Sequence, residues 1–185
     1  MPLRLKTAPA ADPVALADVK AHMNIDFADD DAMLAEYIDA AVASLDGRDG
    51  LLGRALVTQV WTLTLPTFTR EIILPLPPCQ SVNAITYADI AGEVQTLDPS
   101  LYNVTRLNSA EPSRIWTAEP NGWPQTQSLN AEAVTVEFTA GYGDAADVPA
   151  PIRHAIKEHV SRLYENRETG SQLVDAVSAY RLWSF

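Results

Sequence analysis

Three things are scarce in this sequence, and each scarcity excludes a class of protein. The 185 residues include one cysteine, Cys79, so no disulfide can form within the chain and nothing points to an oxidising compartment. No apolar run approaches the roughly 18 residues of a membrane-spanning helix. The first residues, MPLRLKTAPAADPVAL, lack the continuous apolar stretch of a signal peptide. We therefore expect a protein made in the cytosol, with no membrane partner.

Basic residues are the third scarcity: 13 lysines and arginines stand against 24 acidic residues, a net charge of −11. Proteins that bind duplex DNA gain affinity by neutralising phosphates with clustered cations, and this chain has no such cluster. We therefore expect that this chain does not bind DNA. The acidity suits a wall past which DNA slides, but it equally suits simple solubility. With 47% apolar residues, the chain can form the core of one domain, or of one domain with a modest insertion.

Helical periodicity marks the beginning of the chain. Asp12 and Pro13 have the residue types of a helix N-cap and a first helical position. The apolar spacing that follows predicts a helix ending near Asn24. The acidic run 29–31 predicts the start of a second helix, because carboxylates there complement the helix dipole. Apolar residues recur at helical spacing from that run to Gly47, which should end the helix.

From Thr58 the apolar period changes to two, which predicts strands. One face of TQVWTLTL carries Trp61, Leu63 and Leu65. Six or seven short strands are predicted in this region, and Ala91-Gly92, between AITYADI and EVQTL, predicts a hairpin turn. Residues 119–130, EPNGWPQTQSLN, are predicted to form a loop because turn-forming residues interrupt any period.

The helical period returns at Pro149 and Pro151 and ends at Gly170, before the terminal segment LVDAVSAYRLWSF. Helices from both ends of the chain should pack together around their apolar stripes. The predicted fold class is α+β: a small helical bundle made from the N- and C-terminal helices, with an inserted antiparallel β region and a short C-terminal tail. The predicted parts are residues 1–54 (N-terminal helices), 55–147 (inserted β region) and 148–185 (C-terminal helix and tail).

The histidines and the cysteine form no recognisable catalytic motif. His154 and His159 lie five positions apart, so on a helix they point about 140° away from each other. They are not the i, i+4 pair of a zinc protease, and His22 stands alone. Cys79 has no recognisable local signature of a base that would form its thiolate.

The acidic residues are better explained by capping than by metal binding. The segment FADDDAML lacks the glycine and the alternation of a calcium loop. Asp144 and Asp147 in GYGDAAD suit a turn and a cap, and GYGD lacks the lysine and the spacing of a phosphate-binding loop. We predict no catalytic, cofactor-binding or metal-binding residues and therefore no enzyme.

The junction FTAGYGDAADVPAPIRHAI, followed by LYENRE, resembles the carboxy-terminal signature of head–tail adaptor (connector) proteins of long-tailed bacteriophages. Related proteins occur in gene transfer agents. Two further blocks support the resemblance: GRALVTQVWTLTL with LPLPPCQSVNAITYADIAGEVQTLDPSLYNV, and LADVKAHMNIDFADDDAMLAEYIDAA. The segment LDGRDGLLGRAL departs from a shorter link in relatives, which puts the end of the second helix in doubt.

This resemblance implies a structural role without catalytic residues or cofactor. Such adaptors form a ring, usually twelvefold, between the portal protein and a head–tail stopper or tail-completion protein. The ring extends the channel through which DNA passes without specific binding. The implied location is the head–tail interface of a virion or transfer-agent particle, with assembly in the host cytoplasm.

The resemblance also suggests where partners would bind. The tail would dock on the portal through Tyr180, Arg181, Leu182, Trp183 and Phe185, residue types that dominate interface energetics; alternatively, it folds back onto its own core. Trp123 in the predicted loop would contact a neighbouring subunit or the stopper, unless it belongs to the core. Two other functions stay open: a glycan- or peptide-binding β module of a virion, and a virion-associated hydrolase.

Overall fold

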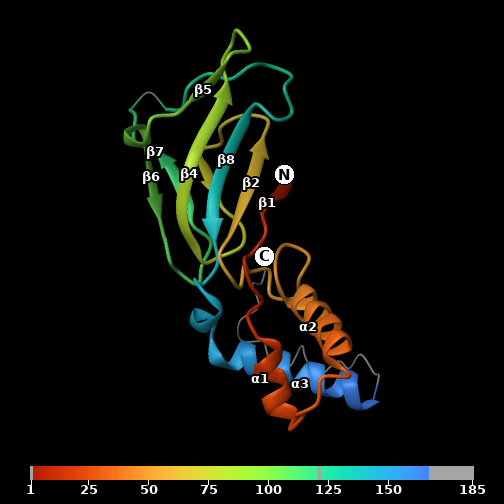
Figure 1. Cartoon of the computed structure of the whole chain (residues 1–185). Helices are drawn as coiled ribbons and strands as arrows, with labels where there is room; N and C mark the ends of the chain where they lie inside the picture. Colours follow the sequence, from red (N-terminus) through yellow and green to blue (C-terminus); the bar gives the residue numbers. More distant parts are fainter. Residues whose placement is uncertain (1, 121, 167–185) are drawn as a thin grey trace. The chain divides into compact units, whose positions relative to one another are not determined.

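The computed structural model describes residues 2–120 and 122–166 of the chain (Figure 1). These residues form two compact units, each with its own core. The sheet unit comprises the described residues within 1–8 and 58–141, and the helical unit comprises those within 9–57 and 142–185. The described elements are helices and antiparallel sheets, so the predicted α+β class is confirmed.

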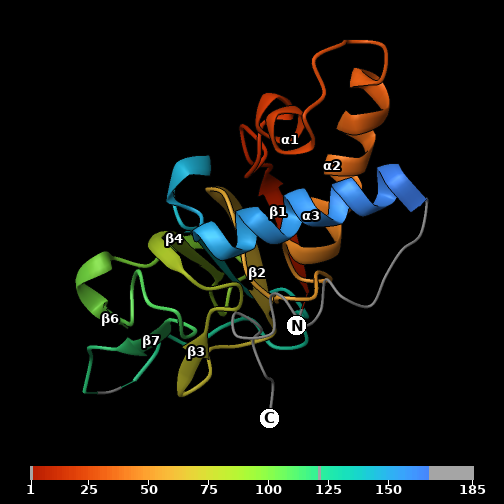
Figure 2. The same cartoon turned by 90° about the horizontal axis from the view of Figure 1, so that it is seen from below.

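The helical unit is built from three α-helices contributed by both ends of the chain. They are α1 (Leu16–Met23), α2 (Asp31–Leu45) and α3 (Ala150–Asn166). Figure 2 shows α3 alongside α1 and α2, and it contacts both. Their apolar stripes enclose one core, whose members include Val19, Leu34, Ile38, Leu45, Ile152, Ile156 and Val160. The hydroxyl of Tyr164 donates to the carboxylate of Asp30 at 2.5 Å, which ties α3 to the beginning of α2.

The observed ends of α1 and α2 agree only in part with those predicted from the sequence. The helix α1 ends where predicted, because Asn24 takes the left-handed conformation (φ 57°) of a C-cap. The helix α2 begins within the acidic run, with Asp30 as its N-cap. The predicted start of α1 is wrong: the helix begins at Leu16 after Ala15, and Pro13 and Val14 are buried instead. Burial of the apolar Val14 in the helical core, at 3% exposed, prevails over the local capping preference.

The sheet unit contains two antiparallel sheets. The five-stranded sheet has the order β1-β2-β8-β4-β5, and the three-stranded sheet has the order β3-β7-β6. The strands are β1 (Leu3–Thr7), β2 (Gln59–Leu65), β3 (Glu71–Ile73), β4 (Cys79–Ala88), β5 (Val94–Thr96), β6 (Tyr102–Thr105), β7 (Arg114–Thr117) and β8 (Val134–Ala140).

The period-two pattern places apolar residues on the inner face as predicted. Trp61, Leu63 and Leu65 of β2 are buried, and Leu63 lies opposite Val136 of β8. The strands β4 and β5 pair around the predicted hairpin turn, in which Gly92 has φ 88°. The largest fully buried side chain of the described chain, Phe138 of β8, belongs to this core.

Two boundaries differ from those expected. Residues 1–54 were predicted to belong to the helices, but Leu3–Thr7 forms β1 and pairs with β2 at the sheet edge. The insertion extends from Thr58 to Gly141 rather than from 55 to 147. The segment LRLKT carries two cations in five residues, a composition that edge strands tolerate because one side stays in solvent.

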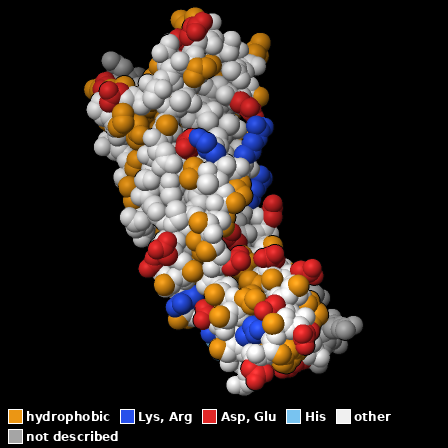
Figure 3. All heavy atoms as spheres, viewed as in Figure 1, with side chains coloured by type: hydrophobic (Ala, Val, Ile, Leu, Met, Phe, Trp, Pro, Cys, Tyr) orange, Lys and Arg blue, Asp and Glu red, His pale blue; other side chains and the backbone are white. Residues whose placement is uncertain are grey.

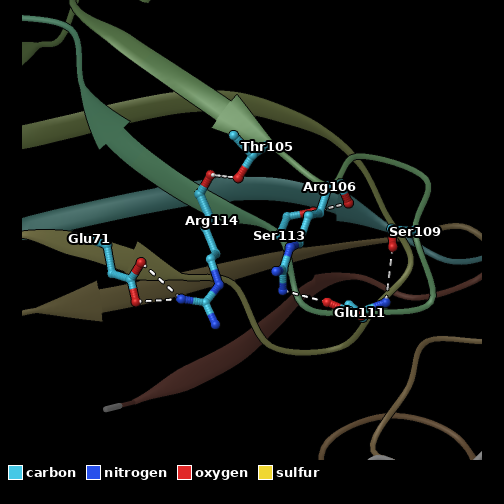
Figure 4. A network of polar contacts seen from close by, with 7 residues as sticks. All are labelled: Glu71, Thr105, Arg106, Ser109, Glu111, Ser113 and Arg114. Carbon is cyan, nitrogen blue, oxygen red and sulfur yellow. Dashed lines mark hydrogen bonds and ion pairs between the residues drawn. The ribbon is translucent and has the colours of Figure 1, made fainter.

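A polar network supports the three-stranded sheet (Figure 4). The guanidinium of Arg114 in β7 donates to both carboxylate oxygens of Glu71 in β3, at 2.7 and 3.0 Å. In the adjoining turn, the Ser113 hydroxyl donates to the carbonyl of Arg106 at 2.8 Å, and Arg106 pairs with Glu111 at 2.5 Å. Charge-assisted bonds of this kind fix the strand ends where the sheet is short.

The shared core of the helical unit can be tested at Leu34, which is fully buried in α2. Replacing it by alanine should lower the free energy of unfolding by about 2–5 kcal/mol, because a cavity replaces buried methyl groups. Glu36→Ala, at an exposed position of the same helix, is the control and should change stability by less than about 0.5 kcal/mol. Urea denaturation measures both. Equal effects of the two substitutions would contradict the assigned core.

Candidate assembly surfaces

Seven large apolar side chains are exposed in the described residues, and three of them gather at one end of the sheet unit. Ile90 is 74% exposed, Val94 is 76% exposed and Leu129 is fully exposed. The first two belong to the β4–β5 hairpin, and the amide of Gln127 donates to the carbonyl of Ala88 at 3.0 Å, which joins the Leu129 loop to it. Contiguous exposed apolar side chains are typical of interaction surfaces.

The hairpin that carries Ile90 and Val94 is firmly built. The Asp89 carboxylate accepts hydrogen bonds from the amides of Ala91 and Glu93, at 2.9 and 3.1 Å, and from the Gln95 side chain at 2.9 Å. The bond from Gln95 and the backbone amides lower the pKa of Asp89, although burial acts in the opposite direction. These bonds support the backbone of the turn that carries the two apolar side chains.

Trp123 packs within its own chain. Its ring stacks on Phe68, with centroids 4.8 Å apart and an angle of 8° between the planes. Phe68 in turn meets Tyr87 of β4 edge-on at 5.6 Å. Each of these three side chains is half-buried, so the cluster anchors the loop that contains Trp123 to the sheet. The predicted contact of Trp123 with another protein stays a prediction.

The predicted portal-docking residues lie outside the described residues. These are Tyr180, Arg181, Leu182, Trp183 and Phe185. On the face drawn in Figure 3, several lysine and arginine side chains lie on the sheet unit and others lie on the helical unit, and acidic side chains are spread over both units. None of the helices described is both long and apolar enough to cross a membrane.

The cysteine and the histidines that the sequence analysis considered as catalytic candidates make packing contacts in the structure. Burial raises the pKa of the Cys79 thiol to about 11, which keeps it protonated and a poor nucleophile at neutral pH. His22 and His154 meet edge-on with ring centroids 5.7 Å apart, a contact between α1 and α3 that no sequence motif indicated. In the described part of the chain, no group of three or more histidine, cysteine or acidic side chains could hold a metal ion.

The predicted capping role of Asp144 and Asp147 is confirmed. The Asp147 carboxylate accepts from the amide of Asp144 at 2.9 Å, and the two residues form a reciprocal capping box around the short 3-10 helix Ala145–Asp147. Gly143 is required beside it, since its φ is 134° and an added Cβ would lie 2.4 Å from the Asp147 carboxylate. The cap directs the chain from the sheet unit into α3.

The arrangement is that of a helical unit, formed by both ends of a chain, with a two-sheet insertion. Residues 13–90 match the family model described as phage gp6-like head-tail connector protein. The matched residues include α1, α2 and the strands β2, β3 and β4, but not β1. The resemblance to head–tail connectors that the sequence indicated is thereby confirmed.

Solved structures of similar fold come from gene transfer agent (GTA) particles. A chain in the neck of an empty GTA particle, computed with C6 symmetry, is 22% identical with a TM-score of 0.80; the match covers 100% of this chain and 97% of that chain. A chain in the native GTA virion is 23% identical with a TM-score of 0.79. A chain in the native neck computed with C12 symmetry is 22% identical with a TM-score of 0.78. Both matches cover 100% of this chain and 97% of the other chain. These likenesses show the fold. No curated protein matches the chain.

His159 provides a test of the helical unit by pH. Its side chain is 7% exposed and its Nδ1 has no hydrogen-bond partner; burial, and then the charge of Arg162, lower its pKa from the ordinary 6.5. As pH falls, His159 is protonated in the unfolded chain at a higher pH than in the folded chain. The free energy of unfolding should therefore fall as pH decreases below about 6.5.

The measurement is urea denaturation of the wild type and of His159→Gln between about pH 7.5 and pH 5.5. The glutamine variant should show a shallower loss of stability on acidification, since the other titrating groups are common to both proteins. A parallel pH dependence in the two proteins would show that His159 is not the group responsible.

Proposed function

We propose that this chain is a structural head–tail connector subunit of a phage or phage-like particle. Copies of it would form a ring between the portal and the stopper or tail-completion protein, and the ring would extend the DNA channel. The observation that carries the proposal is the similarity over the whole chain to chains of GTA particle necks, together with the family match of residues 13–90.

The character of the surface supports an assembly role. Exposed apolar side chains on a rigid hairpin suit protein contacts, and they offer no reactive group. A net charge of −11 suits a channel that DNA traverses without specific binding. The C6 and C12 symmetries named for the similar neck structures support a closed ring, for which we propose twelve subunits. The particle would assemble in the host cytoplasm.

We further propose that the terminal tail docks on the portal through Tyr180, Arg181, Leu182, Trp183 and Phe185. Aromatic and arginine side chains are the common anchors of protein interfaces. The sheet unit, including the Trp123 loop, would face a neighbouring subunit or the stopper.

Removing residues 179–185 tests the docking role. The truncated chain should stay folded and soluble but should no longer bind portal-bearing capsids in sedimentation assays and electron micrographs. Trp183→Ala alone should weaken docking by about 2 kcal/mol or more if the tryptophan is an interface anchor. A truncated chain that melts early or aggregates would assign the tail to the core instead, and wild-type protein that ignores portal complexes would contradict the connector function.

A further inference from the structure

The loop between α1 and α2 displays an aromatic ring to solvent. Phe27 is 45% exposed, and it is the one aromatic residue among the exposed large apolar side chains of the described chain. Asp26 and Asp29, which flank it, are also exposed. Neither carboxylate takes part in an ion pair within residues 2–120 and 122–166. Phe27, Asp26 and Asp29 together form what we name the acidic knob.

The loop holds the acidic knob in a fixed conformation. The Lys20 ammonium donates to the carbonyl of Phe27 at 2.6 Å and to the Asp31 carboxylate at 2.5 Å. The amide of Ile25 donates to the carbonyl of Lys20 at 2.9 Å, and the Ile25 side chain packs against the helical core. These bonds link the backbone at Phe27 to Lys20 of α1 and, through Lys20, to Asp31 of α2, so a contact made by the knob would order little additional backbone.

The same unit contains a cavity that matches this knob in size. The cavity has a volume of about 140 Å³ and is lined by Pro13, Val14, Asp18, Ala150, Arg153 and Lys157. Apolar side chains from the segment before α1 and the first turn of α3 form one part of its wall. A cavity of about 150 Å³ is large enough to hold one benzene ring. The volume therefore suits a phenyl group.

The charges of the cavity are opposite to those of the knob. Arg153 and Lys157 are half-buried, and no ion pair reaches either of them from the described residues. The Nε of Arg153 is buried without a hydrogen-bond partner. Against these two cations the cavity wall has a single acid, Asp18. Unpaired half-buried cations are costly, so a carboxylate brought to this wall would gain a favourable partner.

We propose that Phe27 of one copy enters the cavity of the next copy, with Asp26 and Asp29 facing Arg153 and Lys157. The proposal rests on the ring proposed above and names the surfaces that would close it. Contacts between two different patches of identical chains produce rings or filaments, and here both patches are carried by one compact unit. The chain does not fill its own cavity in this way, because its Phe27 is exposed.

Charge reversal of each patch gives a decisive experiment. The cavity variant carries Arg153→Glu and Lys157→Glu, and the knob variant carries Asp26→Lys and Asp29→Lys. Each variant alone should need at least about tenfold more protein for half-maximal ring assembly, because like charges then face each other. An equimolar mixture should assemble again, since each variant keeps one native patch and the two reversed patches match. Sedimentation velocity and electron micrographs, with and without portal, measure assembly.

Controls separate this contact from folding and from the connector function. Phe27→Ala should weaken assembly, whereas Glu36→Ala, at an exposed position of α2 in the same unit, should not. Recovery in the mixture shows that both charge variants are folded. If the wild type forms rings and the charge variants assemble equally well, the contact is overturned and the connector function stands. Loss of assembly only on removal of residues 179–185 would overturn it as well, and would assign ring assembly to the tail.

Covalent trapping tests the contact even where rings are weak. A Phe27→Cys chain mixed with an Ala150→Cys chain should give disulfide-linked mixed dimers under mild oxidation, whereas each chain alone should give far fewer. The native Cys79 is buried and should not compete. Absence of mixed dimers at high protein concentration would overturn the contact. Mixed dimers from a chain that never binds portal would instead support the contact and contradict the connector function.

Discussion

The structure depends on a core shared by residues from opposite ends of the sequence. Val14 and Leu34 precede the insertion, Ile152 and Ile156 follow it, and all four are buried in one cluster. Closing a long loop costs entropy that grows only slowly with its length, so the burial of these side chains can outweigh it. The insertion also brings its own ends together, because β2 and β8 pair along their whole length with Gln59 opposite Ala140.

Periodicity in the sequence was sufficient wherever one element buries one face. It predicted α2, α3 and the inner face of β2, because burial of one face fixes those patterns, and the Ala91-Gly92 turn predicted the β4–β5 hairpin. It missed β1, whose pairing partner Leu63 lies far along the chain from Leu3. It also missed the contact of His22 with His154 and the stacking of Trp123 on Phe68. These depend on tertiary proximity, for which local sequence has no signal.

The candidate surfaces also depend on tertiary structure that local sequence does not predict. The scarcity of basic residues predicted that the chain does not bind DNA, but composition could not show which apolar residues remain outside the core. Ile25 and Phe27 are two positions apart and similarly apolar, yet Ile25 packs against the helical core while Phe27 is 45% exposed. The Lys20 ammonium donates to the Phe27 carbonyl, a contact that depends on how the α1–α2 loop folds. Local sequence has no signal for which of the two side chains is buried.

Net charge constrains how such a chain can meet copies of itself. Subunits with a charge of −11 repel one another, so a stable contact needs cations that internal pairs have not already neutralised. Six lysine and arginine side chains form ion pairs within the described chain: Arg4, Lys6, Lys20, Arg106, Arg114 and Arg162. Arg153 and Lys157 lie together on the wall of one small cavity, and neither forms an ion pair with a described residue. A contact that places carboxylates beside Arg153 and Lys157 reduces the electrostatic repulsion where two subunits approach most closely. The remaining acidic surface disfavours contacts between subunits in other orientations.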